Sequence, residues 1–87
     1  MNNKIAEWRE RIDDIDEKLL WLLSERKKAI LEIGKVKKEN GWKIADKKRE
    51  KEIFDKLRKK AFESGLNEKY VVSLFKEIIK NSKKEER

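Results

Sequence analysis

The sequence predicts an all-α fold with three helices per chain, one of them very long. The chain of 87 residues contains no proline and three glycines, and it is dominated by Lys, Glu, Leu and Ile, which favour helix formation. Apolar residues also recur every three or four positions in three separate segments, which is the spacing of one helix face. At this length, residues 1–87 are expected to form a single domain.

The first helix is expected to run from Asn3 to Glu39, because Asn40 and Gly41 form a typical C-terminal stop. About 36 residues at roughly 1.5 Å each give a helix about 54 Å long, whereas a compact globule of this size is only about 25–30 Å across. Part of the apolar face therefore needs another chain to cover it, and we expect a homodimer in which two long helices pack together. That face consists of Ile5, Trp8, Ile12, Ile15, Leu19, Leu22, Ala29, Ile33 and Val36.

The second and third helices are shorter. Asp46 is positioned to cap a helix over Lys47–Glu63, which a Ser-Gly pair ends. Asn67 can cap the third helix, whose last residues, 83–87, carry no apolar anchor and are expected to fray. The apolar faces are formed by Ile53, Phe54, Leu57 and Ala61 in the second helix and by Val71, Phe75, Ile78 and Ile79 in the third.

Composition excludes several kinds of site and location. The chain has no His and no Cys, so disulfides and thiol chemistry are excluded, and a zinc or other transition-metal site is not expected. No apolar run approaches the length that crosses a membrane, and the first ten residues lack the apolar segment of a secretion signal. We therefore expect a cytoplasmic protein that does not enter a membrane.

The net charge of +7 is unevenly distributed. Residues 26–60 carry 15 Lys and Arg against six Asp and Glu, whereas residues 1–25 carry four against seven. The central excess can attract a polyanion or a small anionic substrate, but a solvated lysine-rich surface has the same composition. Charge alone leaves these interpretations open.

Polar residues interrupt the apolar face of each helix. At about 100° per residue, Arg26 and Lys37 fall in the middle of the first apolar face, and Glu50 falls on the second. In the third helix, Ser82 and Glu86 continue the apolar spacing. Unpaired buried charge is very costly, so either Glu50 pairs with Arg26 or Lys37, or the groups line a pocket for an anion. The excess of cations and the contribution of all three helices favour the pocket.

These residues resemble a known family, the all-α chorismate mutases of the AroQ class. The resemblance rests on IDDIDEKLLWLLSERKKAILEIGKVK, residues 12–37, followed by DKKREKEI, residues 46–53, and it extends from about Ile5 to Glu86. Members of this family are intertwined homodimers with two active sites, each completed by an arginine from the partner. The resemblance therefore implies an intertwined homodimeric helical bundle.

The resemblance also implies a reaction, the pericyclic rearrangement of chorismate to prephenate in the biosynthesis of Phe and Tyr. Chorismate is a dianion with an enol-pyruvyl ether, and the rearrangement needs no protein nucleophile, no metal and no cofactor. The protein has to hold the reactive diaxial conformer and to stabilise the charge that develops on the ether oxygen. A chain without His and Cys is suited to such a reaction.

By position, the resemblance implies that cations bind the substrate's negative groups. Arg26, together with Arg9 contributed from the other subunit, would bind the carboxylates, because guanidinium binds a carboxylate through two parallel hydrogen bonds. Lys37 would donate to the ether oxygen and a nearby carboxylate. Ser82 would hold the ring carboxylate.

The remaining matched positions are acidic or lie beside an acidic residue. Asp46, Arg49 and Glu50 match positions that handle the substrate's hydroxyl and one carboxylate, with Glu50 fixing the ring hydroxyl and Arg49 supporting the network. Glu86 falls where the family has Gln or Glu facing the ether oxygen. A carboxyl group can donate only when protonated, so activity is expected to fall as the pH rises and Glu86→Gln to relieve this dependence.

Two other functions compete with this interpretation. Isochorismate-pyruvate lyases share the fold and much of the pocket, and they split isochorismate into salicylate and pyruvate; Lys37 and Glu86 favour the mutase. A non-catalytic basic helical dimer that binds nucleic acid or a partner helix would carry its cations outside and have a purely apolar stripe. Arg26, Lys37 and Glu50 break that pattern, so nucleic-acid binding is not expected.

Overall fold

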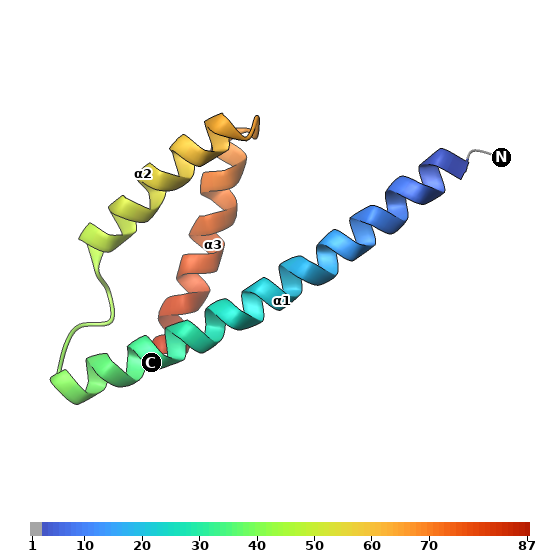
Figure 1. Ribbon diagram of the computed structural model, residues 1–87. Helices are drawn as coiled ribbons and strands as arrows, with labels where there is room; N and C mark the ends of the chain where they lie inside the picture. The colour runs from blue at the N-terminus through green and yellow to red at the C-terminus, as the bar shows by residue number, and fades with distance from the viewer. Residues whose placement is uncertain (1–2) are drawn as a thin grey trace.

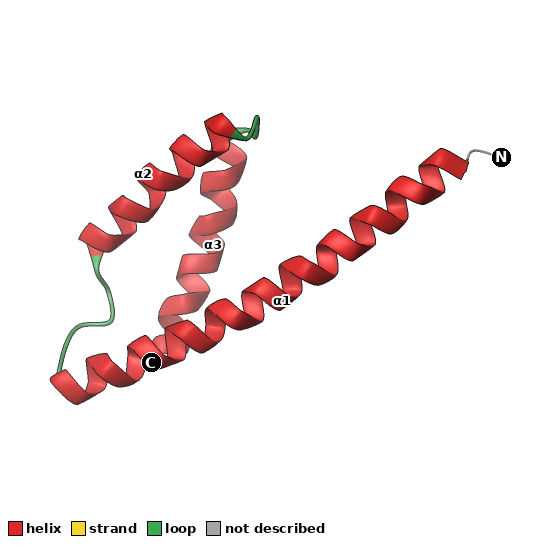
Figure 2. Ribbon diagram, in the orientation of Figure 1, coloured by secondary structure: helices red, strands yellow, loops and turns green. Residues whose placement is uncertain are grey.

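The computed structural model describes residues 3–87 as three helices joined by two loops (Figures 1 and 2). Helix α1 spans Asn3–Asn40, α2 spans Lys47–Glu63 and α3 spans Glu68–Glu86. The predicted all-α fold with one long and two shorter helices is confirmed. The predicted start and end of α2 agree with the structure, and the end of α1 differs from the prediction by one residue.

The helix ends follow from local sequence. Asp46 and Asn67 cap α2 and α3, because each side chain accepts a hydrogen bond at 3.0 Å from the backbone amide three residues further on. Gly41 and Gly65 follow α1 and α2 with φ angles of 66° and 70°. A side chain at either position would be strained, which is why glycine ends these helices.

Helix α3 joins the other two, since it packs against both α1 and α2 while no packing is found between α1 and α2 within residues 3–87. The first half of α1 extends away from the other helices (Figure 1). The molecule measures 60 × 24 × 16 Å with a radius of gyration of 16.7 Å, against about 12 Å for a compact chain of this length. Among residues 3–87, no helix combines the length and the apolar character needed to cross a membrane.

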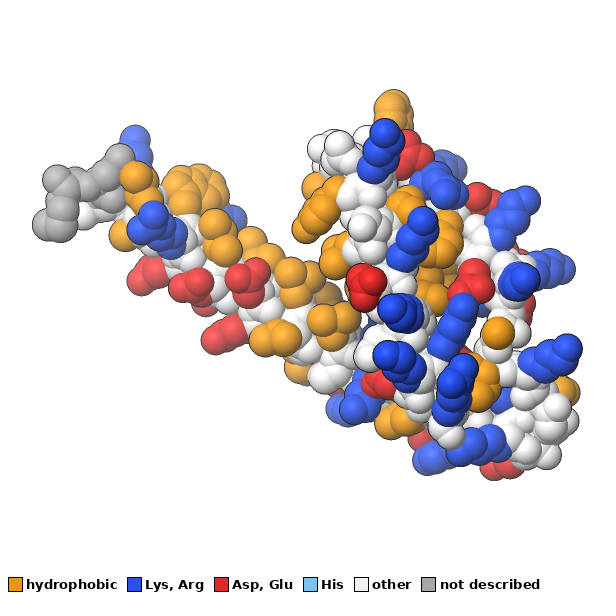
Figure 3. All heavy atoms as spheres, turned by 180° about the vertical axis from the view of Figure 1, so that it is seen from behind, with side chains coloured by type: hydrophobic (Ala, Val, Ile, Leu, Met, Phe, Trp, Pro, Cys, Tyr) orange, Lys and Arg blue, Asp and Glu red, His pale blue; other side chains and the backbone are white. Residues whose placement is uncertain are grey.

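The apolar core of the single chain is small. Its buried apolar residues within the described part are Ala61, Val71 and Ile79. The apolar face of α1 is open along its extending half, where Ile12 and Leu19 are 54% and 53% exposed, and Figure 3 shows hydrophobic side chains running along it beside acidic ones. Apolar surface of this extent is typical of a protein interface. The shape is consistent with the expected second chain.

The C-terminal end of α3 differs from the expected frayed tail. Residues 83–86 are helical, and the side chain of Glu86 is buried. The reason is a tertiary contact that periodicity does not reveal: Glu86 lies against α1, where it pairs with Lys37. A polar residue thus anchors the end of the helix in place of an apolar one.

Candidate active site

The three helices enclose a cavity of about 280 Å³. It lies where α1 and α2 are held apart, so α3 and the loop before α2 complete its wall. Isoleucines from α1, α2, α3 and the loop supply apolar surface, and polar groups from each element supply charge. The lining residues are Arg26, Ile30, Ile33, Lys37, Ile44, Asp46, Arg49, Glu50, Ile53, Ile79, Ser82, Lys83 and Glu86.

Lys37 lines this cavity and is held by two hydrogen bonds. Its Nζ donates to Glu86 Oε1 at 2.8 Å and to the carbonyl oxygen of Ile44 at 2.7 Å. The two charged side chains are 18% and 7% exposed, so water screens their attraction weakly. One ammonium group therefore ties together α1, the loop and the end of α3.

Arg26 lies three turns earlier on α1 and has a different environment. Its Nη1 donates to Ser82 Oγ, and the Ser82 hydroxyl donates to the carbonyl oxygen of Ile78 at 2.9 Å. No carboxylate within residues 3–87 forms an ion pair with Arg26. Because a guanidinium carries five N–H donors, the part-buried Arg26 retains donors and an unbalanced positive charge. Arg26 is therefore a candidate for binding an anion.

Glu50 forms an ion pair with Lys83, whose Nζ lies 2.5 Å from Glu50 Oε1. The alternative of a structural pair between Glu50 and Arg26 or Lys37, which the sequence favoured less than a pocket, is therefore not found within residues 3–87. The sequence reasoning missed Lys83, although a signal was present: Lys83 lies four residues after the buried Ile79, on the same face of α3.

Asp46 and Arg49 lie where α2 begins. The Asp46 carboxylate is occupied in capping α2, through the backbone amide of Arg49. The Arg49 side chain is exposed, and its Nη1 lies 3.7 Å from Oε2 of Glu52. Both residues line the cavity, which places Arg49 at its solvent-exposed rim.

Gly34 explains how the end of α3 can approach α1 so closely. It is the buried residue of α1, and a Cβ at this position would lie 2.8 Å from the carbonyl oxygen of Glu86 and 3.3 Å from its Cα. Those atoms are backbone and cannot rotate away. The glycine lies one turn before Lys37, so the same contact sets the distance between Lys37 and Glu86.

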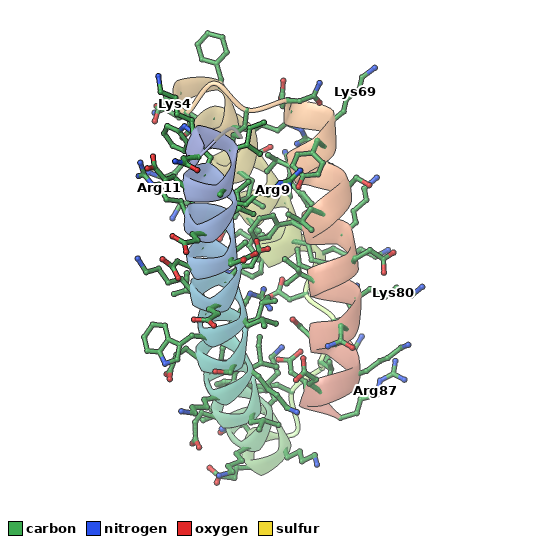
Figure 4. The ribbon with its side chains drawn as sticks, turned by 90° about the vertical axis from the view of Figure 1, so that its right-hand side faces the viewer. Lys4, Arg9, Arg11, Lys69, Lys80 and Arg87 are labelled. Atoms are coloured by element: carbon green, nitrogen blue, oxygen red, sulfur yellow. The ribbon has the colours of Figure 1, made fainter. Side chains whose placement is uncertain are left out.

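Arg9 is the one predicted site residue that does not line the cavity. It is exposed on the extending half of α1, and Figure 4 shows Arg9 and Arg11 projecting from different sides of that helix. Arg9 lies 17 positions before Arg26 on the same helix. This corresponds to about 26 Å along the helix axis, which is much longer than an arginine side chain. Arg9 cannot reach the cavity of its own chain.

The fold and the cavity define an all-α protein with a charged cavity lined by three helices. Comparison with known proteins gives the family: the model described as Chorismate mutase type II matches residues 8–87. The chain belongs to this family, and it is an enzyme of the chorismate mutase class.

Individual relatives agree with the family match. Chorismate mutase from Methanocaldococcus jannaschii is 36% identical over 83 residues, covering 95% of this chain and 84% of that protein. The bifunctional chorismate mutase/prephenate dehydratases of Buchnera aphidicola subsp. Acyrthosiphon pisum and Escherichia coli K12 are 37% and 35% identical over 81 and 80 residues. Those matches cover 93% and 92% of this chain but 21% of each bifunctional protein, so the chain spans about a fifth of their length.

Replacing Gly34 by Ala is expected to lower turnover of chorismate by roughly 10- to 100-fold, because a displacement of about 1 Å in a site can have effects of that size. The added Cβ would push the end of α3 away from α1 and separate Glu86 from Lys37. Alanine favours helix over glycine by about 1 kcal/mol, so loss of α1 would not explain the result. Steady-state kinetics with circular dichroism test this, with Lys35→Ala as the control. Wild-type kinetics in Gly34→Ala would contradict the proposed contact.

Proposed function

We propose that this chain converts chorismate to prephenate in the cavity between its three helices, as a step in the biosynthesis of aromatic amino acids. The observation that carries the proposal is Arg26, a part-buried cation whose polar partner is the neutral hydroxyl of Ser82. A dianionic substrate would supply the missing negative charge. Guanidinium and hydroxyl would together bind one carboxylate.

The remaining chemistry needs a donor at the ether oxygen. An ammonium group has three N–H donors, and Lys37 uses two of them on Glu86 and Ile44. The third would donate to the ether oxygen as the C–O bond breaks and the new C–C bond forms. No proton has to leave the substrate in this rearrangement, so a fixed donor is sufficient.

The acidic residues would orient the ring and complete the donor set. Glu50 would accept the hydrogen bond of the ring hydroxyl, and Asp46 and Arg49 would support it from the start of α2. Glu86 accepts from Lys37 through Oε1, and its other oxygen, when protonated, would donate to the ether oxygen. The isoleucines around them would exclude water from the reacting bond.

The cavity would be completed by a second copy of the chain. Support comes from the open apolar face on the first half of α1 and from Arg9, which lies on that half and is too far from its own cavity. In an intertwined homodimer, the two extending halves would cover each other's apolar faces. Each would then carry Arg9 to the partner's cavity, where a second guanidinium would bind the other carboxylate.

Replacing Arg26 by Ala is expected to lower kcat/KM for chorismate at least about 100-fold, because the anion site would lose its charge-assisted hydrogen bonds. The value of kcat/KM is measured from the loss of chorismate absorbance, and the product is identified separately. Lys28→Ala, which removes an exposed cation two residues away, is the control and should leave kinetics unchanged. If the folded wild type leaves chorismate intact but releases pyruvate from isochorismate, the activity is that of an isochorismate-pyruvate lyase and the proposed mutase activity is wrong.

Replacing Glu86 by Gln is expected to raise kcat for chorismate several-fold at neutral pH, because an amide N–H can donate to the ether oxygen whereas a carboxylate can only accept hydrogen bonds. The amide oxygen of Gln can still accept from Lys37. Steady-state kinetics measure the effect, and Glu63→Gln, an exposed carboxylate outside the cavity, should leave kcat unchanged. An unchanged kcat in Glu86→Gln would show that a donor at this position does not assist the reaction.

Mixing two inactive variants tests whether the site is shared between chains. Arg9→Ala and Arg26→Ala are each expected to be inactive, whereas a refolded equimolar mixture should recover about a quarter of wild-type activity, since half of the dimers would be mixed and hold one intact site. If each site used Arg9 and Arg26 of one chain, no mixed dimer would contain an intact site and no activity would return. Sedimentation analysis of each variant checks that it remains dimeric.

A further inference from the structure

We propose that Lys83 is a positioning residue that fixes the Glu50 carboxylate so that one of its oxygens is directed to the substrate's ring hydroxyl. The inference rests on the proposed function and adds to it a residue that acts through Glu50. Arg26 and Lys37 lie on α1, whereas Lys83 lies on α3. Lys83 therefore adds a third cation to the cavity wall, from a different helix.

The geometry links the two residues closely. Lys83 Nζ lies 2.5 Å from Glu50 Oε1, the side chains are 37% and 24% exposed, and both line the cavity. Lys83 forms the one ion pair of Glu50 within residues 3–87. With the ammonium group on Oε1, Oε2 keeps its full acceptor capacity for a bound molecule. The ion pair therefore restricts the orientation in which Glu50 meets the substrate.

A purely structural role for the pair explains less. Helices α2 and α3 are already joined by a short turn and pack against each other, and each carries a buried apolar residue, Ala61 in α2 and Val71 in α3. An ion pair whose cation is more than one-third exposed contributes little to the stability of the fold. Orientation is affected more strongly, because a glutamate has three rotatable side-chain bonds and without Lys83 its carboxylate would occupy several positions.

The expected kinetic effect follows from when the hydroxyl contact is made. The ring hydroxyl is no part of the bonds that break and form, so Glu50 would bind it equally in the substrate and in the transition state. Loss of such an interaction raises KM and leaves kcat nearly unchanged. A change of Lys83 is therefore expected to appear mainly in KM.

The experiment compares Lys83→Met with Lys84→Met, which removes the same charge from the next, exposed position of α3. Lys83→Met should raise KM for chorismate about tenfold, the size of one charge-assisted hydrogen bond, with kcat within about threefold of wild type. Lys84→Met should leave both constants unchanged. Lys83→Arg, which keeps a cation that can reach Glu50, should have a KM much closer to the wild-type value than that of Lys83→Met.

A double variant shows whether Lys83 acts through Glu50. In a Glu50→Gln background, Lys83→Met is expected to add less than about twofold to KM, because residues that act as one unit are non-additive. A full tenfold effect in that background would show that Lys83 attracts the dianion directly, and it would overturn the proposal. So would an unchanged KM in Lys83→Met, or an equal effect of Lys84→Met. A wild type that does not convert chorismate would instead overturn the proposed function itself.

Discussion

The contact between Lys37 and Glu86 is the interaction on which the rest of the site depends. Because no packing is found between α1 and α2 within residues 3–87, α3 and the loop before α2 determine how far apart the two walls of the cavity lie. The end of α3 is fixed on α1 by this ion pair and by the close approach at Gly34. Removing one member of a buried pair leaves an uncompensated charge and typically costs about 3–5 kcal/mol. The ion pair between Lys37 and Glu86, which lines the cavity, is therefore also one of the main contacts of the fold.

Charge in the interior has a consequence for how the chain is stabilised. The positions that a helical bundle would normally fill with apolar side chains hold Arg26, Lys37, Glu50 and Glu86 here, and the apolar core that remains is small. A chain of this length buries little surface even with a complete core. The long α1 compensates by presenting an apolar face to solvent, which a second chain can cover. The dimer that we propose would thus serve stability as well as catalysis, since the same half of α1 carries the apolar face and Arg9.

Much of this could be predicted from the sequence, because helices and their faces are local properties. The three helices, their caps and the inward position of Arg26, Lys37, Glu50, Ser82 and Glu86 all follow from apolar spacing and from the residues at the helix ends. The partner of each charge does not follow, because it depends on how the helices cross. The structural alternative considered from the sequence paired Glu50 with a cation of α1, whereas Glu50 forms its ion pair with Lys83 of α3. The order of residues 83–86 was missed for the same reason: what anchors them is a contact with Gly34 and Lys37, about 50 residues away in the chain.

Arg26 and Lys37 show how one helix face can hold two cations in different environments. Lys37 has two of its three donors fixed by protein acceptors, so its remaining donor has a defined direction. A fixed donor is suited to charge that appears only in the transition state, because no reorganisation is needed when it forms. Arg26 has one neutral partner and keeps the rest of its planar donor set, which is suited to a carboxylate that is charged from the start. In the function that we propose, the partners supplied by α3, a carboxylate for Lys37 and a hydroxyl for Arg26, would thus determine which cation binds the substrate and which stabilises its rearrangement.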